Sequence, residues 1–314
     1  MKTQHYQLRL EGLTDAQGQI KAQALQRVLA ALIKTAERAT RLLATGEGSA
    51  KGARPEWLEQ AVDFTVTGLT PGSTIIEIDA PQINGIATDI FDQKDFWKDT
   101  PEAGDTALDL AALAIQEVES DDRLGERYDA SVLEAVMDFR RATREEGVSY
   151  QLIPSETARG RFRLTTDTYS RIEERRAQLP APRAFIVRGK LDEIRHSGGR
   201  FRLLLDNGVQ LLGRLHAEFL SGESLRPLWG HPATVEGVVH FKLNGQPRFI
   251  EARKISTPTA GDDVFASLPM VPARMTQDAL FPELLVRNKD ADPMALWGAW
   301  PGDEPLDELM ALLD

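Results

Sequence analysis

The feature that most restricts the fold of this chain is a series of short alternating segments between residues 183 and 256. Apolar and polar residues alternate within each segment, which is the pattern of a β-strand with one buried face. Asn207-Gly208 and Asn244-Gly245 separate neighbouring segments, and Asn-Gly favours the tight turn of a β-hairpin. The expected strands are Phe185–Ile194, Arg200–Leu205, Val209–Leu215, Thr234–Leu243 and Arg248–Ile255, with a short helix around Ala217–Trp229.

Three strands, a helix and two strands thus follow one another. This order resembles that of the OB-fold, a small five-stranded barrel that binds oligonucleotides and proteins. Other small barrels share the order of elements and differ in their connections. The alternating prolines of Leu179-Pro-Ala-Pro-Arg183 favour an extended backbone and indicate a linker before the first strand. Residues 183–256 are therefore predicted to form an OB-like five-stranded β-barrel.

Residues 1–182 contain both helical and strand periodicity and are predicted to form an α+β domain of unknown role. The expected strands are 6–13, 61–67, 74–79, 148–153 and 161–165, and the expected helices are 19–45, 106–118, 130–146 and 167–178. The Gly-rich segment 45–52 lacks the Gly-Lys-Ser/Thr order of a phosphate-binding loop, so we interpret it as a flexible connector. The predicted fold class is α+β, with residues 257–314 as an extended or helical tail.

Composition limits the classes to which the protein can belong. The chain of 314 residues is 42% hydrophobic and 27% charged, which is ordinary for a soluble globular protein. It contains no cysteine, which excludes disulfides, thiolate metal ligands and cysteine nucleophiles. No apolar run approaches eighteen residues and the N-terminus is polar, so we expect neither a membrane span nor a signal peptide. A cytoplasmic location is the expectation.

Charge is distributed unevenly along the chain. Residues 183–256 carry twelve Lys/Arg and seven Asp/Glu, whereas residues 257–314 carry three Lys/Arg and eleven Asp/Glu. A basic module is therefore followed by an acidic tail. The asymmetry indicates an electrostatic partner for one of the two segments, or a tail that lies across the basic module of its own chain.

The basic module carries candidate nucleic-acid-binding residues on its first two predicted strands. They are Arg188, Lys190, Arg200 and Arg202. Strand alternation places Arg188 with Lys190 on one face, and Arg200 with Arg202 on one face. Phe185 and Phe201 lie among them, and basic groups with aromatic rings are what single-stranded nucleic acid requires. The same alternation also fits a role for both rings in the barrel core.

No pattern of catalytic or metal-binding residues is found in the sequence. The histidines of the barrel lack the spacing of metal ligands and are expected at surface or edge positions; they are His196, His216, His231 and His240. Ser73 and Ser155 lack a nucleophile-elbow context, and adjacent acids such as Asp121-Asp122 point to different sides of a helix. The sequence therefore predicts a non-enzymatic protein with no catalytic residue, no metal and no cofactor.

The acidic tail contains apolar pieces that are too short and too broken by proline to form a core. Burying one indole ring removes about 150–250 Å² of surface from water, so Trp297 and Trp300 favour contact with another surface. Leu306, Leu309, Met310 and Leu313 follow at helical spacing and form one apolar stripe. Acidic segments with apolar anchors of this kind fold upon binding, either to a partner or to their own domain.

The end of the tail resembles the C-terminal ends of antitoxins of PIN-domain (VapB/VapC-type) toxin–antitoxin systems. Such tails carry a Gly-x-Trp-Pro-Gly-Asp-Glu stretch and then a short Leu-rich acidic helix. The stretch is matched by Gly298, Trp300, Pro301, Gly302, Asp303 and Glu304, and the helix by Leu306, Leu309, Met310, Leu312 and Leu313. The match covers about a twentieth of the chain, whose large body has no recognisable DNA-binding domain of the antitoxin kind.

The resemblance implies a PIN-domain ribonuclease toxin as the protein partner and an antitoxin function. It also implies that a basic side chain can enter the acidic magnesium site of the toxin. The expected partner-binding residues are Arg287, Lys289, Leu296, Trp297, Trp300, Pro301, Asp303, Glu304, Leu306, Leu309, Met310 and Leu313. Two alternatives remain: an OB-like single-stranded nucleic-acid-binding protein with an acidic regulatory tail, and an enzyme of unrecognised class seated in residues 1–182.

Overall fold

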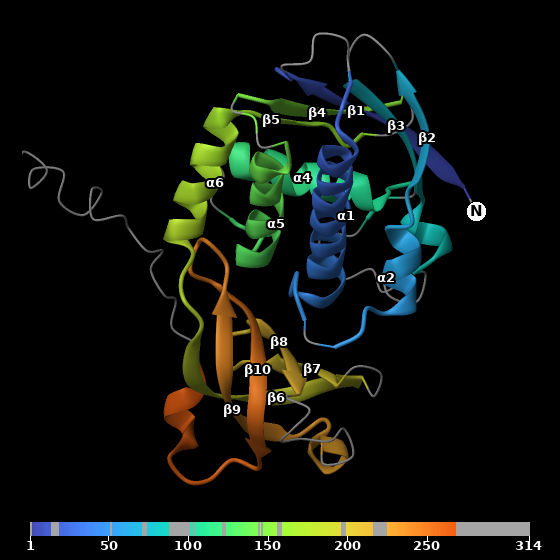
Figure 1. The fold of residues 1–314 in the computed structure, drawn as a ribbon. Helices are drawn as coiled ribbons and strands as arrows, with labels where there is room; N and C mark the ends of the chain where they lie inside the picture. The colour runs from blue at the N-terminus through green and yellow to red at the C-terminus, as the bar shows by residue number, and fades with distance from the viewer. Residues whose placement is uncertain are drawn as a thin grey trace, which may run out of the picture. The chain divides into compact units, whose positions relative to one another are not determined.

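The computed structural model describes residues 2–13, 19–50, 52–70, 74–87, 101–102, 104–120, 124–143, 145, 147–155, 159–195, 199–215 and 225–267. All of them belong to one compact unit, Met1–Arg274. Figure 1 shows that this unit contains an α+β part, formed by residues up to 179, and a β-barrel, formed by residues 183–256. A search of the described helices for a candidate membrane span finds none.

A five-stranded sheet forms one layer of the α+β part. Its strands are β1 (Thr3–Glu11), β2 (Thr65–Thr70), β3 (Thr74–Pro81), β4 (Ser149–Pro154) and β5 (Phe162–Leu164). They pair antiparallel in the order β2-β3-β1-β4-β5, so the first strand of the chain lies in the centre. Alternate residues of β1, among them Tyr6, Leu8 and Leu10, are buried, as expected of a sheet that is covered on one face.

Helices form the second layer and cover that face of the sheet (Figure 1). They are α1 (Ala22–Thr45), α2 (Glu56–Ala61), α4 (Ala107–Glu119), α5 (Ala130–Ala142) and α6 (Thr166–Gln178), with a 3₁₀ turn, η1, at Ile83–Gly85. Helix α1 packs against α4 and α5. Leu32 of α1, Ile115 of α4 and Val136 of α5 lie in the same core as the inner residues of the sheet.

The predicted elements of this part are largely present, with two corrections. Helix α2 was not predicted, and it occupies the beginning of the expected strand 61–67, so that β2 starts later, at Thr65. A single buried turn around Leu58 is too short to produce a clear helical period. The expected helix 130–146 ends at Ala142, with Thr143 as its C-cap.

The barrel has the OB-like topology that was predicted. Its strands are β6 (Arg183–Arg195), β7 (Arg200–Leu204), β8 (Gln210–Leu215), β9 (Pro232–Phe241) and β10 (Pro247–Ser256). They close in the order β10-β8-β7-β6-β9, with β8 parallel to β10 and all other pairs antiparallel. Between β8 and β9 the structure describes a 3₁₀ turn, η2 (Arg226–Leu228). Residues 217–224 of the expected helix 217–229 lie outside the described residues.

Alternate residues of the strands fill the interior of the barrel. Val187 and Leu191 of β6 and Leu203 of β7 are completely buried in this core. The Phe201 ring lies over Gly213 of the neighbouring strand, where a Cβ atom would come within 2.1 Å of a ring carbon. Only glycine leaves room for the ring at this position.

We therefore predict that Gly213→Ala destabilises the protein. The new methyl group must displace Phe201, and overpacking of this kind costs about 1–3 kcal/mol. Gly85→Ala serves as the control, because a Cβ at Gly85 meets no atom within 4 Å. The free energy of unfolding, measured by urea denaturation, should fall for Gly213→Ala and change by less than about 0.5 kcal/mol for Gly85→Ala. Equal stability of the two variants would contradict the packing described here.

Candidate functional site

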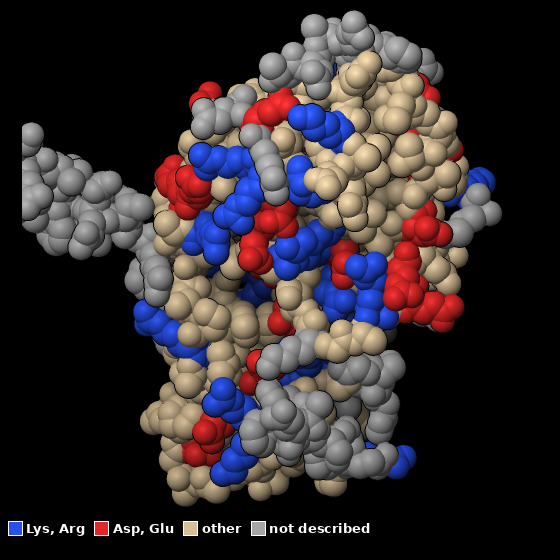
Figure 2. All heavy atoms as spheres, viewed as in Figure 1, with Lys and Arg blue, Asp and Glu red and all other residues tan. Residues whose placement is uncertain are grey.

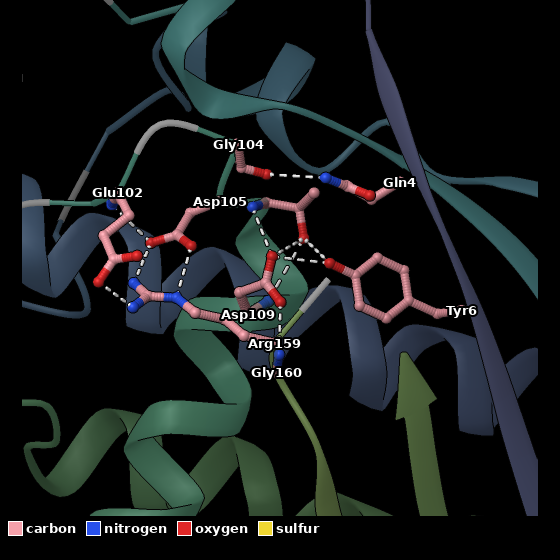
Figure 3. A network of polar contacts seen from close by, with 9 residues as sticks. Gln4, Tyr6, Glu102, Gly104, Asp105, Asp109, Arg159 and Gly160 are labelled. Atoms are coloured by element: carbon pink, nitrogen blue, oxygen red, sulfur yellow. Dashed lines mark hydrogen bonds and ion pairs between the residues drawn. The ribbon is translucent and has the colours of Figure 1, made fainter. Parts of the chain in front are cut away.

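A network of buried polar groups surrounds Asp109 at the start of α4 (Figure 3). One carboxylate oxygen of Asp109 accepts hydrogen bonds from the Tyr6 hydroxyl at 2.7 Å and from the Thr106 backbone N–H at 2.8 Å. The other oxygen accepts from the backbone N–H of Gly160 at 2.7 Å. Asp109 is only 1% exposed, so these bonds replace the water that a buried carboxylate loses.

Local sequence explains why the carboxylate lies here. Thr106 is the N-cap of α4, and its hydroxyl accepts from the Asp109 backbone N–H at 3.3 Å while the Asp109 side chain bonds back to Thr106. This capping box satisfies N–H groups that a helix leaves unpaired at its first turn. Gly160 approaches so closely that a Cβ would lie 2.5 Å from the Asp109 Cα. The network therefore joins α4, the central strand and the segment before β5.

The Tyr6 hydroxyl stays protonated in this environment. Burial first, and then the negative charge of Asp109, raise the pKa of Tyr6 far above its ordinary value. The hydroxyl also contacts the Thr106 hydroxyl at 2.8 Å. Because the carboxylate already accepts several hydrogen bonds and the phenol is held neutral, neither group is prepared to act as a base or a nucleophile.

A second acidic side chain, Asp105, holds Arg159 beside this network. The guanidinium donates two parallel bonds to the carboxylate, at 2.8 and 2.6 Å, and also pairs with Glu102 (Figure 3). The hydrogen bonds that Arg159 donates to Asp105 are the main reason why the pKa of Arg159 is raised. Bidentate pairing of this kind fixes the orientation of both groups.

A cavity of about 90 Å³ lies next to this ion pair. Its lining is apolar on the side of the helices and charged on the other, and comprises Ala39, Leu43, Glu102, Asp105, Leu110, Leu113, Arg127 and Arg159. Two guanidinium and two carboxylate groups balance one another, so the lining favours neither an anion nor a cation. The cavity can hold a few water molecules or a small neutral molecule.

The predicted nucleic-acid-binding residues on β6 lie on the outer face of the barrel. Lys190 is exposed, and Arg188 is half-buried. Arg188 forms an ion pair with Asp263 of the 3₁₀ turn η3 (Asp262–Phe265), which follows the barrel. Thr234 of β9 donates a 2.7 Å hydrogen bond to Asp262 of the same turn. The beginning of the acidic tail thus binds this part of the basic face.

The residues on β7 are also engaged within the chain. Arg200 donates to the Ala44 carbonyl near the end of α1 at 3.3 Å, and Arg202 pairs with Glu193 at 3.0 Å. Phe201 is buried in the barrel core, and Phe185 packs against that core and against Phe241. Both rings therefore contribute to packing, Phe201 completely and Phe185 in part.

The turn between β9 and β10 is inserted into the α+β part. Leu243 of this turn is 1% exposed and belongs to the core of the α+β part. Arg248 donates to the carbonyl oxygens of Glu126 and Tyr128, both at 2.9 Å, and to that of Gly125. Burial lowers the pKa of Arg248, and the surrounding carbonyls replace the water that its guanidinium loses.

Strand β8 makes a second contact with the α+β part. Arg214 pairs with Glu47 and, at 2.9 Å, with Glu251 of β10. Burial raises the pKa of Glu47. Gly48 donates its N–H to Asp129, the N-cap of α5, at 2.8 Å. The interpretation of residues 45–52 as a flexible connector is therefore wrong for Glu47 and Gly48, which side-chain hydrogen bonds hold in place.

These contacts occupy the side of the barrel on which OB-folds bind oligonucleotides. That side comprises the second and third strands and the loop between the fourth and fifth strands. Here they correspond to β7, β8 and the turn at 242–246, and all three contact the α+β part through Arg200, Arg214 and Lys242, the last at 2.5 Å from Glu126. The α+β part therefore takes the place that a nucleic acid would need.

Charges of both signs lie beside one another on the face formed by α1, α5 and α6 (Figure 2). Ion pairs connect the helices here: Lys34 to Asp138 at 2.7 Å, Arg38 to Glu134 at 2.9 Å and Arg140 to Glu173 at 2.8 Å. A polyanion would meet carboxylates among the cations on this face. Among the described residues, no group of three or more His, Asp or Glu side chains is placed to hold a metal ion.

The predicted partner-binding residues, from Arg287 to Leu313, lie outside the described residues. His196 and His216 also lie outside them, whereas His231 is exposed and His240 stacks on Phe249 with ring centroids 4.2 Å apart. In comparisons with known proteins, no family model, curated protein or solved structure matches the chain.

Sequence reasoning missed the Asp109 network and the junction between the two parts. The Thr106-x-x-Asp109 pattern was a signal for the capping box. For Tyr6, Gly160 and Arg248 the sequence contains no comparable signal, because their partners lie about 50 to 120 residues away.

We predict that Asp109→Asn destabilises the protein, because the amide nitrogen cannot accept the bonds that one carboxylate oxygen now accepts. Leaving a buried donor unsatisfied costs about 1–3 kcal/mol. Asp63→Asn, at an exposed position, is the matched control. Urea denaturation should show a lower free energy of unfolding for Asp109→Asn alone. If Asp109→Asn unfolds like the control, the network does not stabilise the fold.

We also predict that His240 makes stability dependent on pH. Burial lowers the pKa of His240 below the ordinary value of 6.5, and its Nε2 atom is buried without a hydrogen-bond partner. The unfolded chain therefore binds a proton at this histidine more readily than the folded chain does. Neutral His240 makes its full contribution to the free energy of unfolding above the ordinary pKa. This contribution is lost as the pH falls from the ordinary pKa to the lowered pKa of the folded protein.

The measurement is the urea midpoint of unfolding between about pH 7.5 and about pH 5.5. His240→Phe should lose less stability on acidification than the wild type, because phenylalanine keeps the stacking on Phe249 and cannot be protonated. His231→Phe changes an exposed histidine and should keep the wild-type dependence. The raised pKa of Glu47 acts in the opposite direction in all three proteins and cancels in the comparison. Identical pH dependence in all three would contradict the assignment.

Proposed function

We propose that this protein binds and neutralises a PIN-domain ribonuclease through its C-terminal tail, as an antitoxin does. The observation that carries the proposal is the sequence from Leu296 to Leu313, in which the Trp-Pro-Gly-Asp-Glu stretch precedes an acidic, leucine-rich segment. Large aromatic side chains dominate the binding energy of protein interfaces. Trp297 and Trp300 are therefore the anchors, and the apolar stripe that follows fits a hydrophobic groove.

Contacts between the barrel and the beginning of the tail support the proposal. After β10 the chain turns back onto β6 and β9, where Asp263 pairs with Arg188 and Asp262 accepts from Thr234. Thr259 also donates its N–H to Asp262 at 2.8 Å. These bonds hold the root of the tail at a fixed point on the barrel.

Arg287 and Lys289 complete the proposed mechanism. They are the two basic residues within the acidic stretch 275–314. PIN-domain ribonucleases hold magnesium with clustered carboxylates, and a cation placed among these carboxylates competes with the metal. One of the two side chains is therefore proposed to enter the nuclease site, while the indoles and leucines provide most of the affinity.

Single-stranded nucleic-acid binding is a weaker second candidate. In its favour stand the positive charge of the barrel and the exposed Lys190. Against it stand the buried Phe201, the ion pairs of Arg188 and Arg202, and the contact of β7 and β8 with the α+β part. No specific observation favours this function over the first.

The test is co-expression with the product of the adjoining gene, which we expect to encode a PIN-domain ribonuclease. The full chain should restore growth, and a chain that ends at Ser267 should not, because it keeps the folded body and lacks the anchors. Trp300→Ala should weaken binding by about 2–4 kcal/mol, or about 30- to 1,000-fold in Kd measured by calorimetry.

Trp229→Ala is the matched control, because Trp229 is a 64% exposed tryptophan on the barrel, outside the tail. It should bind the nuclease as the wild type does. Protection by the chain that ends at Ser267, or equal binding by Trp300→Ala and the wild type, would show that the tail is not the inhibitor.

A further inference from the structure

Strand β2 is an edge strand of the sheet in the α+β part. In the part of the chain that the structure describes, β2 pairs with β3 on one side and with no strand on the other (Figure 1). Its sequence, Thr-Val-Thr-Gly-Leu-Thr, contains no charged residue and no proline. Natural edge strands commonly carry a lysine, another charge or a proline, which prevents pairing with another chain. The opposite edge, β5, is only three residues long and contains Arg163.

The exposed apolar side chains of β2 lie on the face of the sheet that is packed by helices. Val66 pairs with Ile78 and Leu69 with Ile76, and side chains of directly paired residues share a face. Both isoleucines are completely buried, whereas Val66 is 43% and Leu69 is 53% exposed. The core layer therefore continues to the edge of the sheet and is open there.

A bulge in β2 produces this arrangement. Residues three apart in a regular strand point to opposite faces, but the register with β3 shifts between Val66 and Gly68. The extra residue turns Leu69 onto the same face as Val66. A bulge often interrupts an edge and so protects it. This one instead places both apolar side chains of the strand where a neighbouring strand would extend the core.

The strand is complementary to itself. An antiparallel pair of two β2 strands, centred between Thr67 and Gly68, places Val66 opposite Leu69 of the second copy and Leu69 opposite Val66 of the second copy. Thr65 then lies opposite Thr70, and no charged residue of the strand faces a like charge. A two-fold axis through the centre generates both apolar pairs at once, as an isologous interface requires.

We propose that β2 is a self-association surface, at which two copies of this chain pair edge to edge and join their sheets. The occupant of the edge is a second copy, because the register that buries Val66 also buries Leu69 and adds no unpaired charge. An interface of one short strand is at the small end for stable complexes, so the dimer forms reversibly with concentration. The proposal is independent of the function proposed for the tail.

The experiment is sedimentation velocity of the full chain over a wide range of concentrations. The mass should rise from 34.8 kDa to about twice that value. Val66→Lys and Leu69→Glu should each weaken self-association about tenfold or more, because each places a charge opposite an apolar residue in both pairs of the dimer. Val209→Lys is the matched control, since Val209 is the same residue type, 41% exposed, in a turn of the barrel.

Mixing the two variants tests the register. Lys at position 66 of one chain then faces Glu at position 69 of the other, and the remaining pair is the native Val66–Leu69 pair. A 1:1 mixture of Val66→Lys and Leu69→Glu should dimerise more strongly than either variant alone. Because both chains enter a dimer only if they are folded, recovery in the mixture also excludes misfolding as the cause of the weakening.

Three results would overturn the proposal. The wild type could stay at 34.8 kDa at every concentration. It could dimerise while Val66→Lys and Leu69→Glu dimerise as well as Val209→Lys, which would locate the interface elsewhere. Finally, the mixture could associate no better than the separate variants, which would exclude the antiparallel register on which the argument rests.

Discussion

The insertion of the β9–β10 turn into the α+β part is the contact on which the rest of the described structure depends. Leu243 enters the core of that part, and Arg248 bonds to three carbonyl oxygens of the segment that leads into α5. A buried guanidinium is stable only where acceptors replace its lost water, so these bonds also determine the path of residues 125–128. The barrel and the helices are therefore built around a shared junction.

This junction has a functional consequence. The strands and the loop with which an OB-like barrel binds oligonucleotides are the ones that contact the α+β part. The Asp109 network is likewise explained by structure, since its carboxylate joins a helix cap, the central strand and the segment before β5. Among the described residues, the polar groups with the most hydrogen bonds and ion pairs therefore stabilise the fold. The partner binding that we propose belongs to the tail, whose first residues, Asp262 and Asp263, are held on β9 and β6.

Local patterns predicted much of the fold and little of the site. The Asn-Gly turns and alternating strands of the barrel are signals between neighbours in sequence, and the closed five-stranded barrel confirms them. Helix α2 and the place of Gly48 were missed, because one helical turn and one glycine have no periodicity to read. Three of the four predicted basic residues, Arg188, Arg200 and Arg202, bond within the chain, and the sequence missed this for a different reason. Alternation tells which face a residue is on, but not whether Asp263 or Glu193 will pair with it.

The sequence by itself determined the α+β class, the order of elements in the barrel and the acidic, aromatic tail, because these follow from periodicity, turn chemistry and composition within short windows. The tertiary structure alone decided that the barrel face is covered, that Asp109 is saturated with hydrogen bonds and that β2 leaves apolar side chains open at an edge. Each of these depends on residues that are distant along the chain and meet only when the sheet, the helices and the barrel pack together.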